Sequence, residues 1–427
     1  MEIEKLHQLF LESSFITTDT RKVEKNALFF ALKGERFDAN TFAKEAIEKG
    51  ACYVVIDNKD FFINEKTILV DNTLTTLQEL AKYHRTFLAI PIIGLTGSNG
   101  KTTSKELINA VLSQKFKVKA TVGNLNNHIG VPLTLLTFDE TTEIGIVELG
   151  ANHQKEIEFL CEIAQPDFGY ITNFGKAHLE GFGGFEGVIT GKSEMYHFLK
   201  NNKKTVFVNL DDTIQVDKSQ SITPYTFSAK DKKADVYITE IKANPFVTIT
   251  YNDQSIQSQL VGIYNGTNIS AAITMGHYFG VPDLLIQQAI ENYNPTNNRS
   301  QLSTKGSNHL ILDAYNANPS SMGVALQNFI KLPESNKVAF LGDMFELGVE
   351  SLKEHTFLVE SLKDEVHIQF YFIGLEFYKT KTELAHFNFF ETFEDLKEAL
   401  EHCKFENNYI LIKGSRGMAL ERIIDLL

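Results

Sequence analysis

The sequence reads Ile92-Ile93-Gly94-Leu95-Thr96-Gly97-Ser98-Asn99-Gly100-Lys101-Thr102-Thr103, an apolar run that passes into a glycine-rich turn. Residues 89–95 are mostly apolar without polar alternation, which predicts a strand buried on both faces. From Thr102 onward, apolar residues recur at helical spacing, namely at Leu107, Ile108, Val111 and Leu112. The stretch therefore predicts a strand, a tight loop and a helix, in that order, within an α/β fold.

The turn has the residues of a phosphate-binding loop. Gly97 and Gly100 let the backbone bend tightly and direct successive N–H groups into one concavity. The N-terminus of the following helix favours negative charge, Lys101 would reach the outer phosphates and the Thr102 hydroxyl a magnesium ion. Leu95 stands where the longer pattern has its first glycine, so the match is to the shorter G-x-x-G-K-T form. The alternative is an ordinary glycine-rich turn, but the order of strand, loop, Lys-Thr and helix favours nucleotide binding.

Length, composition and charge restrict the class of protein. The chain of 427 residues predicts about three domains. Its composition, 43% hydrophobic and 22% charged, is typical of a soluble globular protein with a large core. The formal net charge of −13 argues against nucleic acid or an anionic membrane surface as a partner. Any anionic substrate must therefore be bound by local lysines, arginines and backbone N–H groups.

The three cysteines, Cys52, Cys161 and Cys403, lie far apart and form no C-x-x-C pair. This usage fits a reducing cytoplasm and offers neither a disulfide framework nor a zinc site. No N-terminal apolar segment is flanked by positive charge, and no apolar run is long enough to cross a bilayer. We therefore expect a cytoplasmic protein without a membrane partner, and we expect a monomer.

Residues 1–88 are predicted to form a small α/β domain, and residues 89–298 the central domain. In the central domain, an amide-rich loop at 123–132 is followed by a predicted strand at 143–147 that ends in Glu148. A carboxylate at the carboxyl end of a buried parallel strand, after a phosphate loop, is where a magnesium ligand is needed. A surface glutamate at a strand end is the alternative, and Glu148 alone does not decide between them.

Two further residues of the central domain are ambiguous when taken alone. A predicted strand at 168–172 leads into a loop that contains His178, and a lone loop histidine is more often a hydrogen-bonded surface residue than a metal ligand. Lys192 lies at the opening of a predicted helix and by itself would be a solvated lysine. Farther on, residues 262–268 precede a predicted helix at 269–279.

Residues 299–427 are predicted to form a third domain, in which the same arrangement of a strand followed by a loop occurs three times. Each of its three predicted strands ends in a polar or glycine-rich loop; the strands are 309–312, 338–341 and 409–412. In open parallel sheets, ligands bind outside the carboxyl ends of the strands. We therefore expect the loops that follow these strands to line one face of a crevice.

In combination, these motifs resemble the Mur ligase family of peptidoglycan precursor synthesis. The resemblance spans all three predicted domains and rests on TGSNGKTT at 96–103, GNLNNHIGVP at 123–132, ELGANH at 148–153, AHLEGFG at 177–183, DAYNANPSSM at 313–322, GDMFELG at 342–348 and KGSR at 413–416. It implies a central P-loop ATPase-like domain with a parallel sheet, flanked by a UDP-binding α/β domain and a Rossmann-like C-terminal domain. It also implies an ATP-dependent ligase that joins D-alanyl-D-alanine to UDP-N-acetylmuramoyl-tripeptide through an acyl phosphate.

The resemblance further implies a role for each matching position. The implied ATP contacts are Gly97, Ser98, Asn99, Gly100, Lys101, Thr102, Thr103, Asn265, Asn268, Arg299 and Asp313. The implied ligands of two magnesium ions are Thr102 and Glu148 for one and His178 with a carbamylated Lys192 for the other, and the implied catalytic residues are Lys101, Glu148, His178 and Lys192. The implied substrate contacts are Thr20, Arg21, Lys33, Asp38 and Asn40 for the uridine diphosphate, and Asn124, Asn126, Asn127, Tyr315, Asn316, Asn318, Lys413, Ser415 and Arg416 for the rest.

The sequence departs from the family pattern in three places. Tyr264 stands where the family usually has histidine, which bears on adenine stacking. Asn26 replaces a common glycine, and residues 38–42 read DANTF instead of the usual D-G-H-D-F, which bears on the uridine contacts. The sequence does not indicate whether the tripeptide ends in lysine or diaminopimelate.

Three alternative functions would each be expected to show a different set of motifs. A sister ligase that adds the third residue, or a glutamate chain to folate, would share the phosphate loop but not DAYNANPSS, and the folate type would lack the UDP domain. A GTPase-like switch is disfavoured because no N-K-x-D motif follows an apolar strand in the central domain. A non-catalytic relative would be expected to lose Lys101, Glu148, His178 or Lys192, and all four are present.

Overall fold

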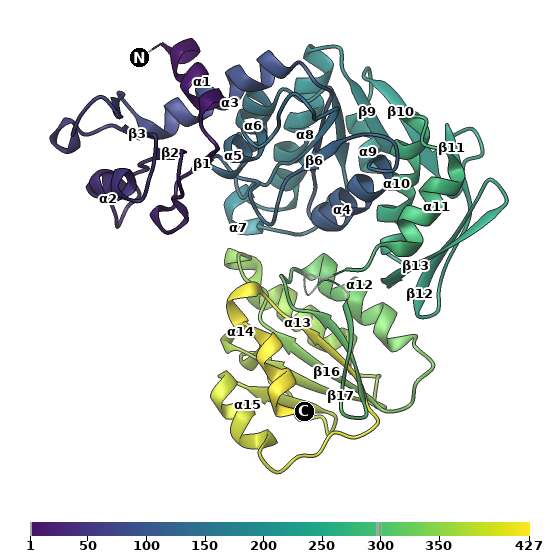
Figure 1. Ribbon diagram of the computed structural model, residues 1–427. Helices are drawn as coiled ribbons and strands as arrows, with labels where there is room; N and C mark the ends of the chain where they lie inside the picture. Colours follow the sequence, from purple (N-terminus) through teal and green to yellow (C-terminus); the bar gives the residue numbers. More distant parts are fainter. Residues whose placement is uncertain (1, 296–298, 300) are drawn as a thin grey trace.

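The computed structural model describes residues 2–295, 299 and 301–427. The chain forms three α/β domains, each built on its own sheet (Figure 1). The purple N-terminal domain and the green to yellow C-terminal domain lie on different sides of the larger central domain. We propose residues 1–88, 89–298 and 299–427 as the limits of the three domains, as the sequence predicts.

The N-terminal domain contains a parallel four-stranded sheet in the order β1-β2-β3-β4. Its strands are β1 (Phe15–Thr17), β2 (Ala27–Phe30), β3 (Tyr53–Ile56) and β4 (Thr67–Leu69). Its helices are α1 (Ile3–Glu12), α2 (Ala43–Glu48) and α3 (Thr73–Leu88), with short turns η1 (Thr20–Lys22), η2 (Ala39–Phe42) and η3 (Lys59–Phe61). Leu28 and Phe30 pack with residues of α1 and α3, whereas Ala27 and Phe29 pack with residues of α2. Alternate residues of β2 thus point to opposite faces, and both faces are covered by helices.

Helix α3 joins the N-terminal domain to the central domain through buried polar contacts. Nε2 of His84 lies 2.9 Å from the carbonyl oxygen of Phe138, which can only accept, so Nε2 carries the proton. Nδ1 of His84 therefore accepts a hydrogen bond of 2.9 Å from Nε2 of His7 on α1. The next residue, Arg85, donates to Asp167 at 2.7 Å and to the carbonyl of Ala164 at 3.2 Å. These contacts fix the first domain against the second.

The central domain is built on a nine-stranded sheet in the order β13-β12-β11-β10-β9-β8-β5-β7-β6, in which β12 alone runs antiparallel to its neighbours. The strands are β5 (Ile92–Thr96), β6 (Val118–Ala120), β7 (Ile144–Glu148), β8 (Phe168–Ile171), β9 (Thr205–Asn209), β10 (Thr223–Ser228), β11 (Val236–Ala243), β12 (Phe246–Tyr251) and β13 (Gln254–Val261). The helices are α4 (Lys101–Leu112), α5 (Gly130–Leu135), α6 (Glu156–Ala164), α7 (Leu179–Phe182), α8 (Phe185–Asn201), α9 (Thr213–Lys218), α10 (Asn265–Tyr278) and α11 (Asp283–Asn292).

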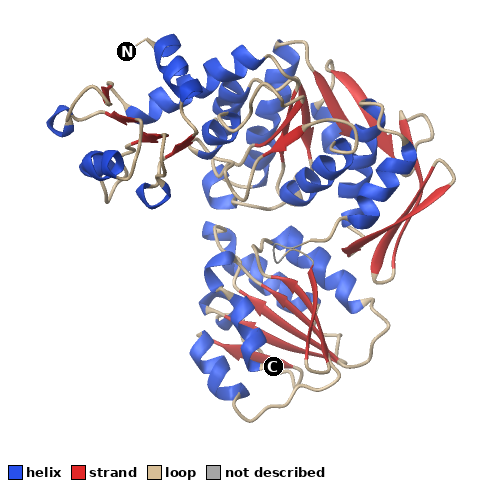
Figure 2. Cartoon of the chain, in the orientation of Figure 1, coloured by secondary structure: helices blue, strands red, loops and turns tan. Residues whose placement is uncertain are grey.

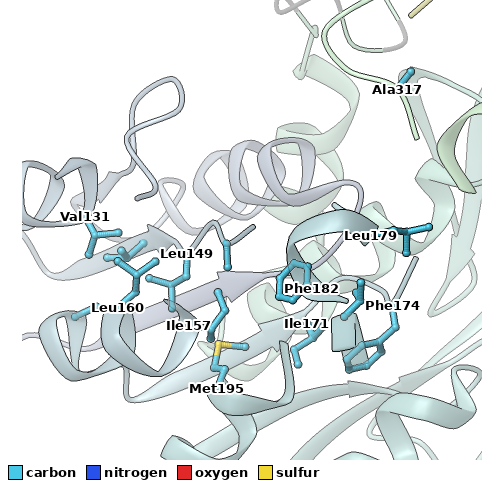
Figure 3. Close-up of a cluster of buried hydrophobic side chains, with 14 of the residues drawn as sticks. Val131, Leu149, Ile157, Leu160, Ile171, Phe174, Leu179, Phe182, Met195 and Ala317 are labelled. Atoms are coloured by element: carbon cyan, nitrogen blue, oxygen red, sulfur yellow. The ribbon is translucent and has the colours of Figure 1, made fainter. Parts of the chain in front are cut away.

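Helices cover both faces of this sheet around β5, as the apolar sequence of that strand predicts (Figure 2). On one face, Ile93 and Leu95 of β5 pack against α4, α10 and α11. On the other face, Ile92 packs with residues of α5, α6 and α8. Figure 3 shows part of this second cluster, in which Leu149, Ile157 and Met195 lie together and Ala317 comes from the C-terminal domain.

The C-terminal domain contains a six-stranded sheet in the order β14-β15-β19-β16-β17-β18, in which only β14 is antiparallel to its neighbour. The strands are β14 (Gln301–Lys305), β15 (Asn308–Asp313), β16 (Lys337–Gly342), β17 (Ile368–Ile373), β18 (Phe387–Phe390) and β19 (Tyr409–Lys413). The helices are α12 (Pro319–Ile330), α13 (Ser351–Ser361), α14 (Leu375–Tyr378) and α15 (Phe393–Leu400), with η4 (Gly348–Glu350), η5 (Arg416–Met418) and η6 (Leu420–Leu426). The three predicted strands of this domain are confirmed as β15, β16 and β19.

Some predicted elements differ in their bounds. The strand predicted at 89–95 begins only at Ile92, because α3 continues to Leu88 and Ala89 adopts a left-handed conformation at its end. The helix predicted at 269–279 already begins at Asn265. Within the described residues, no helix is both long and apolar enough to cross a membrane.

Candidate active site

A cavity of about 810 Å³ lies where the central and C-terminal domains face each other. From the central domain it is lined by the phosphate loop, the amide-rich loop, the ends of β7 and β8 and the start of α10. From the C-terminal domain it is lined by the residues that follow β15, by the start of α12 and by Lys413. Loops that follow parallel strands therefore enclose it, as the sequence predicts.

The phosphate loop has the backbone that its glycines allow. Gly97 has φ +144° and Gly100 has φ +77°, and a Cβ at Gly97 would clash with Oγ1 of Thr172. Nζ of Lys101 donates to the carbonyl of Gly97 at 2.8 Å and so folds back over the loop. Burial lowers the pKa of Lys101, and the charge of Glu148 acts in the opposite direction. The loop amides at the start of α4 and the Lys101 cation therefore face the same cavity as an anion-binding site.

Glu148 ends β7 inside the protein, so the alternative of a surface glutamate is wrong. The residue is 2% exposed. Its Oε2 accepts a hydrogen bond of 3.1 Å from Oγ1 of Thr102, and its Oε1 accepts one of 2.9 Å from Nδ2 of Asn126. The amide-rich loop thus orients the carboxylate toward the first turn of α4.

The oxygen atoms of Thr102 and Glu148 suit a hard cation. Mg²⁺ takes one or two protein oxygens and completes its shell with water and substrate phosphates. Among the described residues, no three histidine, cysteine or acidic side chains are grouped to hold a metal by themselves. The donor set at Thr102 and Glu148 therefore fits magnesium better than zinc, which binds three or four protein ligands.

His178 reaches the cavity, and a carboxylate of the other domain contacts it. His178 lines the cavity with a left-handed backbone of φ 52°. Its Nδ1 contacts Oε2 of Glu346, which lies in the loop between β16 and η4 of the C-terminal domain. Because Nδ1 is engaged, Nε2 is the ring nitrogen that remains for a ligand.

Lys192 is buried in α8 and is not the solvated lysine of the alternative interpretation. It is 1% exposed, and its Nζ lies 5.2 Å from the ring centre of Phe182. Burial, with a further effect of the Lys101 charge, lowers the pKa of Lys192 well below its usual range, while Glu194 acts to raise it. The carboxylate of Glu194 instead accepts hydrogen bonds from the backbone of Lys155 at 2.6 Å and Glu158 at 3.0 Å. In the described part of the chain, no carboxylate lies within 4.0 Å of Lys192 Nζ, and Lys192 lies outside the residues that line the cavity.

A row of amide side chains connects α10 to α4. Oγ of Ser104 donates to Oδ1 of Asn268 at 3.0 Å, and Nδ2 of Asn268 donates to Oδ1 of Asn265 at 2.8 Å. Both asparagines are buried and line the cavity beside Tyr264. The predicted nucleotide contacts Asn265 and Asn268 are thereby brought next to the phosphate loop, since Ser104 lies one turn after Gly100.

The C-terminal domain brings two cations to the cavity. The guanidinium of Arg299 lies 3.7 Å from the ring centre of Tyr315. Nζ of Lys413, at the end of β19, donates to Oδ2 of Asp313 at 2.6 Å and to the carbonyl of Asn316 at 3.3 Å. All five residues line the cavity, as the sequence predicts.

Asn316 and Asn318 lie in the same loop but differ in their bonding. Asn316 accepts a hydrogen bond of 2.9 Å from the next backbone N–H and leaves its Nδ2 without a partner among the described residues. Asn318 caps α12, because its Oδ1 accepts from the backbone of Ser321 at 2.9 Å. Its Nδ2 donates to Oδ1 of Asn99 at 2.7 Å, across the domain boundary. Asn318 therefore has structural partners for both amide atoms.

Several predicted site residues lie away from the cavity, and their roles stay predictions. Oγ of Ser415 accepts from the backbone of Phe345 at 2.9 Å, and Arg416 pairs with Glu421 at 3.0 Å. In the N-terminal domain, Nδ2 of the buried Asn40 donates to Asp38 at 2.6 Å and to Asp57 at 2.8 Å. The other predicted residues outside the lining are Thr20, Arg21, Lys33 and Lys192, together with Gly97.

Sequence reasoning missed some residues that line the cavity, among them His128, Asn152, Glu156, Phe159, Asn209 and Asp212. Asn209 ends β9 and Asp212 caps α9 directly after it. The strand-end rule that identified Glu148 would have identified these two, had the strand at 205–209 been predicted.

Comparison with known proteins agrees with this arrangement in all three domains. The Mur ligase middle domain model matches residues 95–276, and the model of the Mur ligase glutamate ligase domain matches residues 298–416. A third model, of the Mur ligase family catalytic domain, matches residues 12–85. The chain belongs to the Mur ligase family. The residues that the family models match include the phosphate loop, Glu148 and the loop after β15.

Individual relatives in the Mur ligase family are similar over nearly the whole chain. The UDP-N-acetylmuramoyl-tripeptide--D-alanyl-D-alanine ligase of Bacillus subtilis is 35% identical over 424 residues, which cover 96% of this chain and 92% of the relative. A crystal structure of MurF from Acinetobacter baumannii has a TM-score of 0.87 at 30% identity and covers 99% of this chain and 98% of that one. MurF from Thermotoga maritima in complex with ADP has a TM-score of 0.85 at 25% identity and covers 98% and 97%.

Proposed function

We propose that this Mur ligase joins D-alanyl-D-alanine to UDP-N-acetylmuramoyl-tripeptide with ATP, and releases ADP and phosphate. The observation that carries the proposal is the shared cavity, in which the phosphate loop of one domain faces the loop after β15 of another. The relatives at 35% and 30% identity, which bear the name of this ligase or of MurF, support the same activity.

The chemistry requires activation, because a carboxylate is a poor electrophile at neutral pH. The terminal carboxylate of the tripeptide attacks the γ-phosphorus of ATP, the bond to the ADP oxygen breaks, and an acyl phosphate forms. The amine of the dipeptide then attacks the acyl carbon, loses a proton and expels phosphate through a tetrahedral intermediate. Negative charge develops on phosphoryl oxygens in the first step and on the carbonyl oxygen in the second.

The central domain supplies cations and N–H groups for the first step. Lys101 and the N–H groups at the start of α4 face the cavity and would hold the β- and γ-phosphates. Thr102 and Glu148 would hold a magnesium ion, which when bound neutralises charge on phosphoryl oxygens. The complex of the Thermotoga maritima relative with ADP supports the proposal that this chain binds an adenine nucleotide.

We also propose that Lys192 is carbamylated and, with His178, holds a second magnesium ion. Burial favours the neutral amine of Lys192, the form that reacts with CO₂. The product is an anion with two oxygen atoms, which suits a hard cation, whereas an ammonium group would repel it. The absence of a carboxylate partner within 4.0 Å of Nζ among the described residues supports this proposal.

In the C-terminal domain, Arg299 and Asp313 would contact the nucleotide, whereas Asn316 and Lys413 would contact the dipeptide or the transferred phosphate. The Arg299 guanidinium can donate to phosphoryl oxygens, and the Asn316 amide can donate to a carboxylate. In the N-terminal domain, the loops that hold Arg21 and Lys33 would contact the uridine diphosphate. From the cysteine usage, we further propose a cytoplasmic location, and we also propose that the protein is a monomer.

Phosphate release tests the proposal directly. The protein is mixed with ATP and magnesium, with and without D-alanyl-D-alanine, and with UDP-tripeptides that end in lysine or in diaminopimelate. We expect phosphate release only when both acceptor and dipeptide are present, and a product whose mass equals their sum less one water. Release with folate and glutamate, or with a free amino acid in place of the dipeptide, would overturn the assignment in favour of a sister ligase.

A further inference from the structure

Lys176 of the central domain is held by the C-terminal domain at two points. It lies in the segment 172–178, which follows β8. Its backbone N–H donates to Oγ of Ser320 in the first turn of α12 at 2.8 Å. Its Nζ donates to Oε1 of Glu354 in the first turn of α13 at 2.5 Å.

Glu354 is a buried charge whose partner belongs to another domain. Its side chain is 6% exposed, whereas that of Lys176 is 45% exposed. Among the residues that the structure describes, no cationic side chain other than that of Lys176 lies within 4.0 Å of this carboxylate. A buried carboxylate without a partner is strongly unfavourable, so the contact between α13 and the segment 172–178 depends on Lys176.

The same segment is bonded to the phosphate loop. The backbone N–H of Ser98 donates to the carbonyl of Asn173 at 3.1 Å, and Oγ of Ser98 donates to the carbonyl of Gly175 at 2.8 Å. The carbonyl of Asn99 accepts from Oγ1 of Thr172 at 2.6 Å. The segment 172–178 therefore touches the phosphate loop on one side and α12 and α13 on the other.

We propose that Lys176 and Glu354 are positioning residues, whose ion pair sets the C-terminal domain at the distance from the phosphate loop that the reaction needs. The inference rests on the proposed ligase function. The acyl phosphate forms over the central domain, and the dipeptide that attacks it is bound by the loop that leads into α12. A misplacement of about 1 Å between such groups can lower a rate by roughly a hundredfold.

The first test is Lys176→Met, which keeps the length of the side chain and removes its charge. We expect kcat to fall by about tenfold or more, because one partner of a buried, hydrogen-bonded pair is lost. The KM for ATP should change by less than about threefold, since Lys101, Thr102 and Asn268 are untouched. The matched control is Lys353→Met on α13, whose ion pair with Glu350 is exposed, and kcat should stay within about twofold.

A second variant separates positioning from a loss of stability. Adding Glu354→Gln to Lys176→Met removes the unpaired buried charge, so kcat should rise several-fold above that of the single variant. Lys176→Arg should keep most of the wild-type kcat. Melting temperatures and the radius of gyration from X-ray scattering are measured alongside, and Lys176→Met should have the larger radius at an unchanged melting temperature.

Two results would overturn the inference. One is a kcat and a radius of gyration of Lys176→Met that match those of the wild type. The other is a double variant that is no more active than Lys176→Met, with a melting temperature lowered in both. If the wild-type protein itself has no ligase activity, the proposed function fails, while the comparison of radii still decides whether the pair holds the two domains together.

Discussion

The hydroxyl of Thr102 lies 3.1 Å from Oε2 of Glu148, although 46 positions separate the two residues. The distance follows from strand order, because β5 pairs directly with β7 and Leu95 lies opposite Glu148 in the register. The loop after β5 therefore turns back over the end of β7. The Thr102 hydroxyl at the start of α4 and the Glu148 carboxylate at the end of β7 therefore lie side by side in the lining of the cavity.

This pair predicts the effect of Glu148→Gln. The change keeps the size of the side chain but removes a negative charge from the proposed magnesium site. We expect the magnesium concentration for half-maximal activity to rise by about tenfold or more, with kcat reduced. Activity is measured over a magnesium titration at saturating ATP. A variant with the wild-type magnesium dependence would contradict the assignment of Glu148.

Lys101→Ala tests the phosphate loop itself. Its Nζ donates to the carbonyl of Gly97 within the loop at 2.8 Å, and its loss would remove a contact to developing phosphoryl charge. We expect kcat to fall by on the order of a hundredfold or more, with a melting temperature close to that of the wild type. Near-normal turnover would show that Lys101 does not act on phosphoryl transfer.

The phosphate loop and the strand-end residues could be predicted because their signals are local. A buried strand, two glycines and a helix follow one another within about fifteen residues of sequence, so no tertiary information is needed. The positions of Glu148 and Asp313 follow from the same rule applied to other strands. The rule raised magnesium binding as one of two alternatives for Glu148, whereas the family resemblance favoured it and supplied the nucleotide-binding role of Asp313.

Burial and partners could not be predicted, because they depend on residues far away in the sequence. The sequence alone suggests that Lys192 is solvated, but α8 packs that residue against Phe182. Asn318 was predicted to bind substrate, but its amide caps α12 and contacts Asn99. The strands β10 to β13 were not predicted either, although buried and more exposed residues alternate along β12, the pattern typical of a strand with one solvated face. That signal was present in the sequence and was missed.

Asn316→Leu tests recognition of the dipeptide. Asn316 lines the cavity beside Lys413 and is free to donate from Nδ2 among the described residues. We expect the KM for D-alanyl-D-alanine to rise by about tenfold or more, and the KM for ATP to change little. Asn318→Leu is the contrasting variant, because it should lower the melting temperature through the loss of a helix cap. Equal effects of Asn316→Leu on both substrates would indicate a structural turn instead.

The His7–His84 pair predicts how stability depends on pH. Burial, with a smaller effect of His84, lowers the pKa of His7 to about 4, and burial also lowers the pKa of His84. The unfolded chain, with histidine pKa values of about 6.5, therefore binds more protons than the folded protein between about pH 6.5 and pH 4. The contribution of this pair to the free energy of unfolding is therefore fully present above about pH 6.5 and is lost as the pH falls from about 6.5 to about 4.

We expect the melting temperature to fall between pH 7 and pH 5, and to fall less steeply in His7→Leu. At pH 7 the variant should melt at a lower temperature than the wild type, because Nδ1 of His84 loses its donor. The exposed His402→Gln is the control, with the slope of the wild type. An unchanged slope in His7→Leu would show that the pair does not carry the pH dependence.

The last prediction concerns Lys192, which is buried without a carboxylate within 4.0 Å of Nζ among the described residues. Its nearest acid in sequence, Glu194, accepts backbone hydrogen bonds at the start of α6, so an ion pair with Glu194 does not explain the burial. A carbamate would replace an unfavourable buried ammonium by an anion that, together with His178, can bind a magnesium ion. Lys192→Arg keeps a positive charge but cannot form the carbamate.

We therefore expect Lys192→Arg to be nearly inactive, and the wild type to lose activity in buffer freed of CO₂ and regain it when bicarbonate is added. In ¹³C-bicarbonate the wild type should give a carbamate resonance that Lys192→Arg lacks, a readout that does not depend on turnover. Lys105→Arg is the matched control, because Lys105 is also a buried lysine, but its Nζ donates to the carbonyl of Thr121 at 2.7 Å. The Lys105→Arg variant should keep the ¹³C resonance, because the Nζ of Lys105 is engaged with a carbonyl and Lys105 is not the residue proposed to be carbamylated. Full activity of the wild type without CO₂, or the same ¹³C spectrum for wild type and Lys192→Arg, would rule out the carbamate.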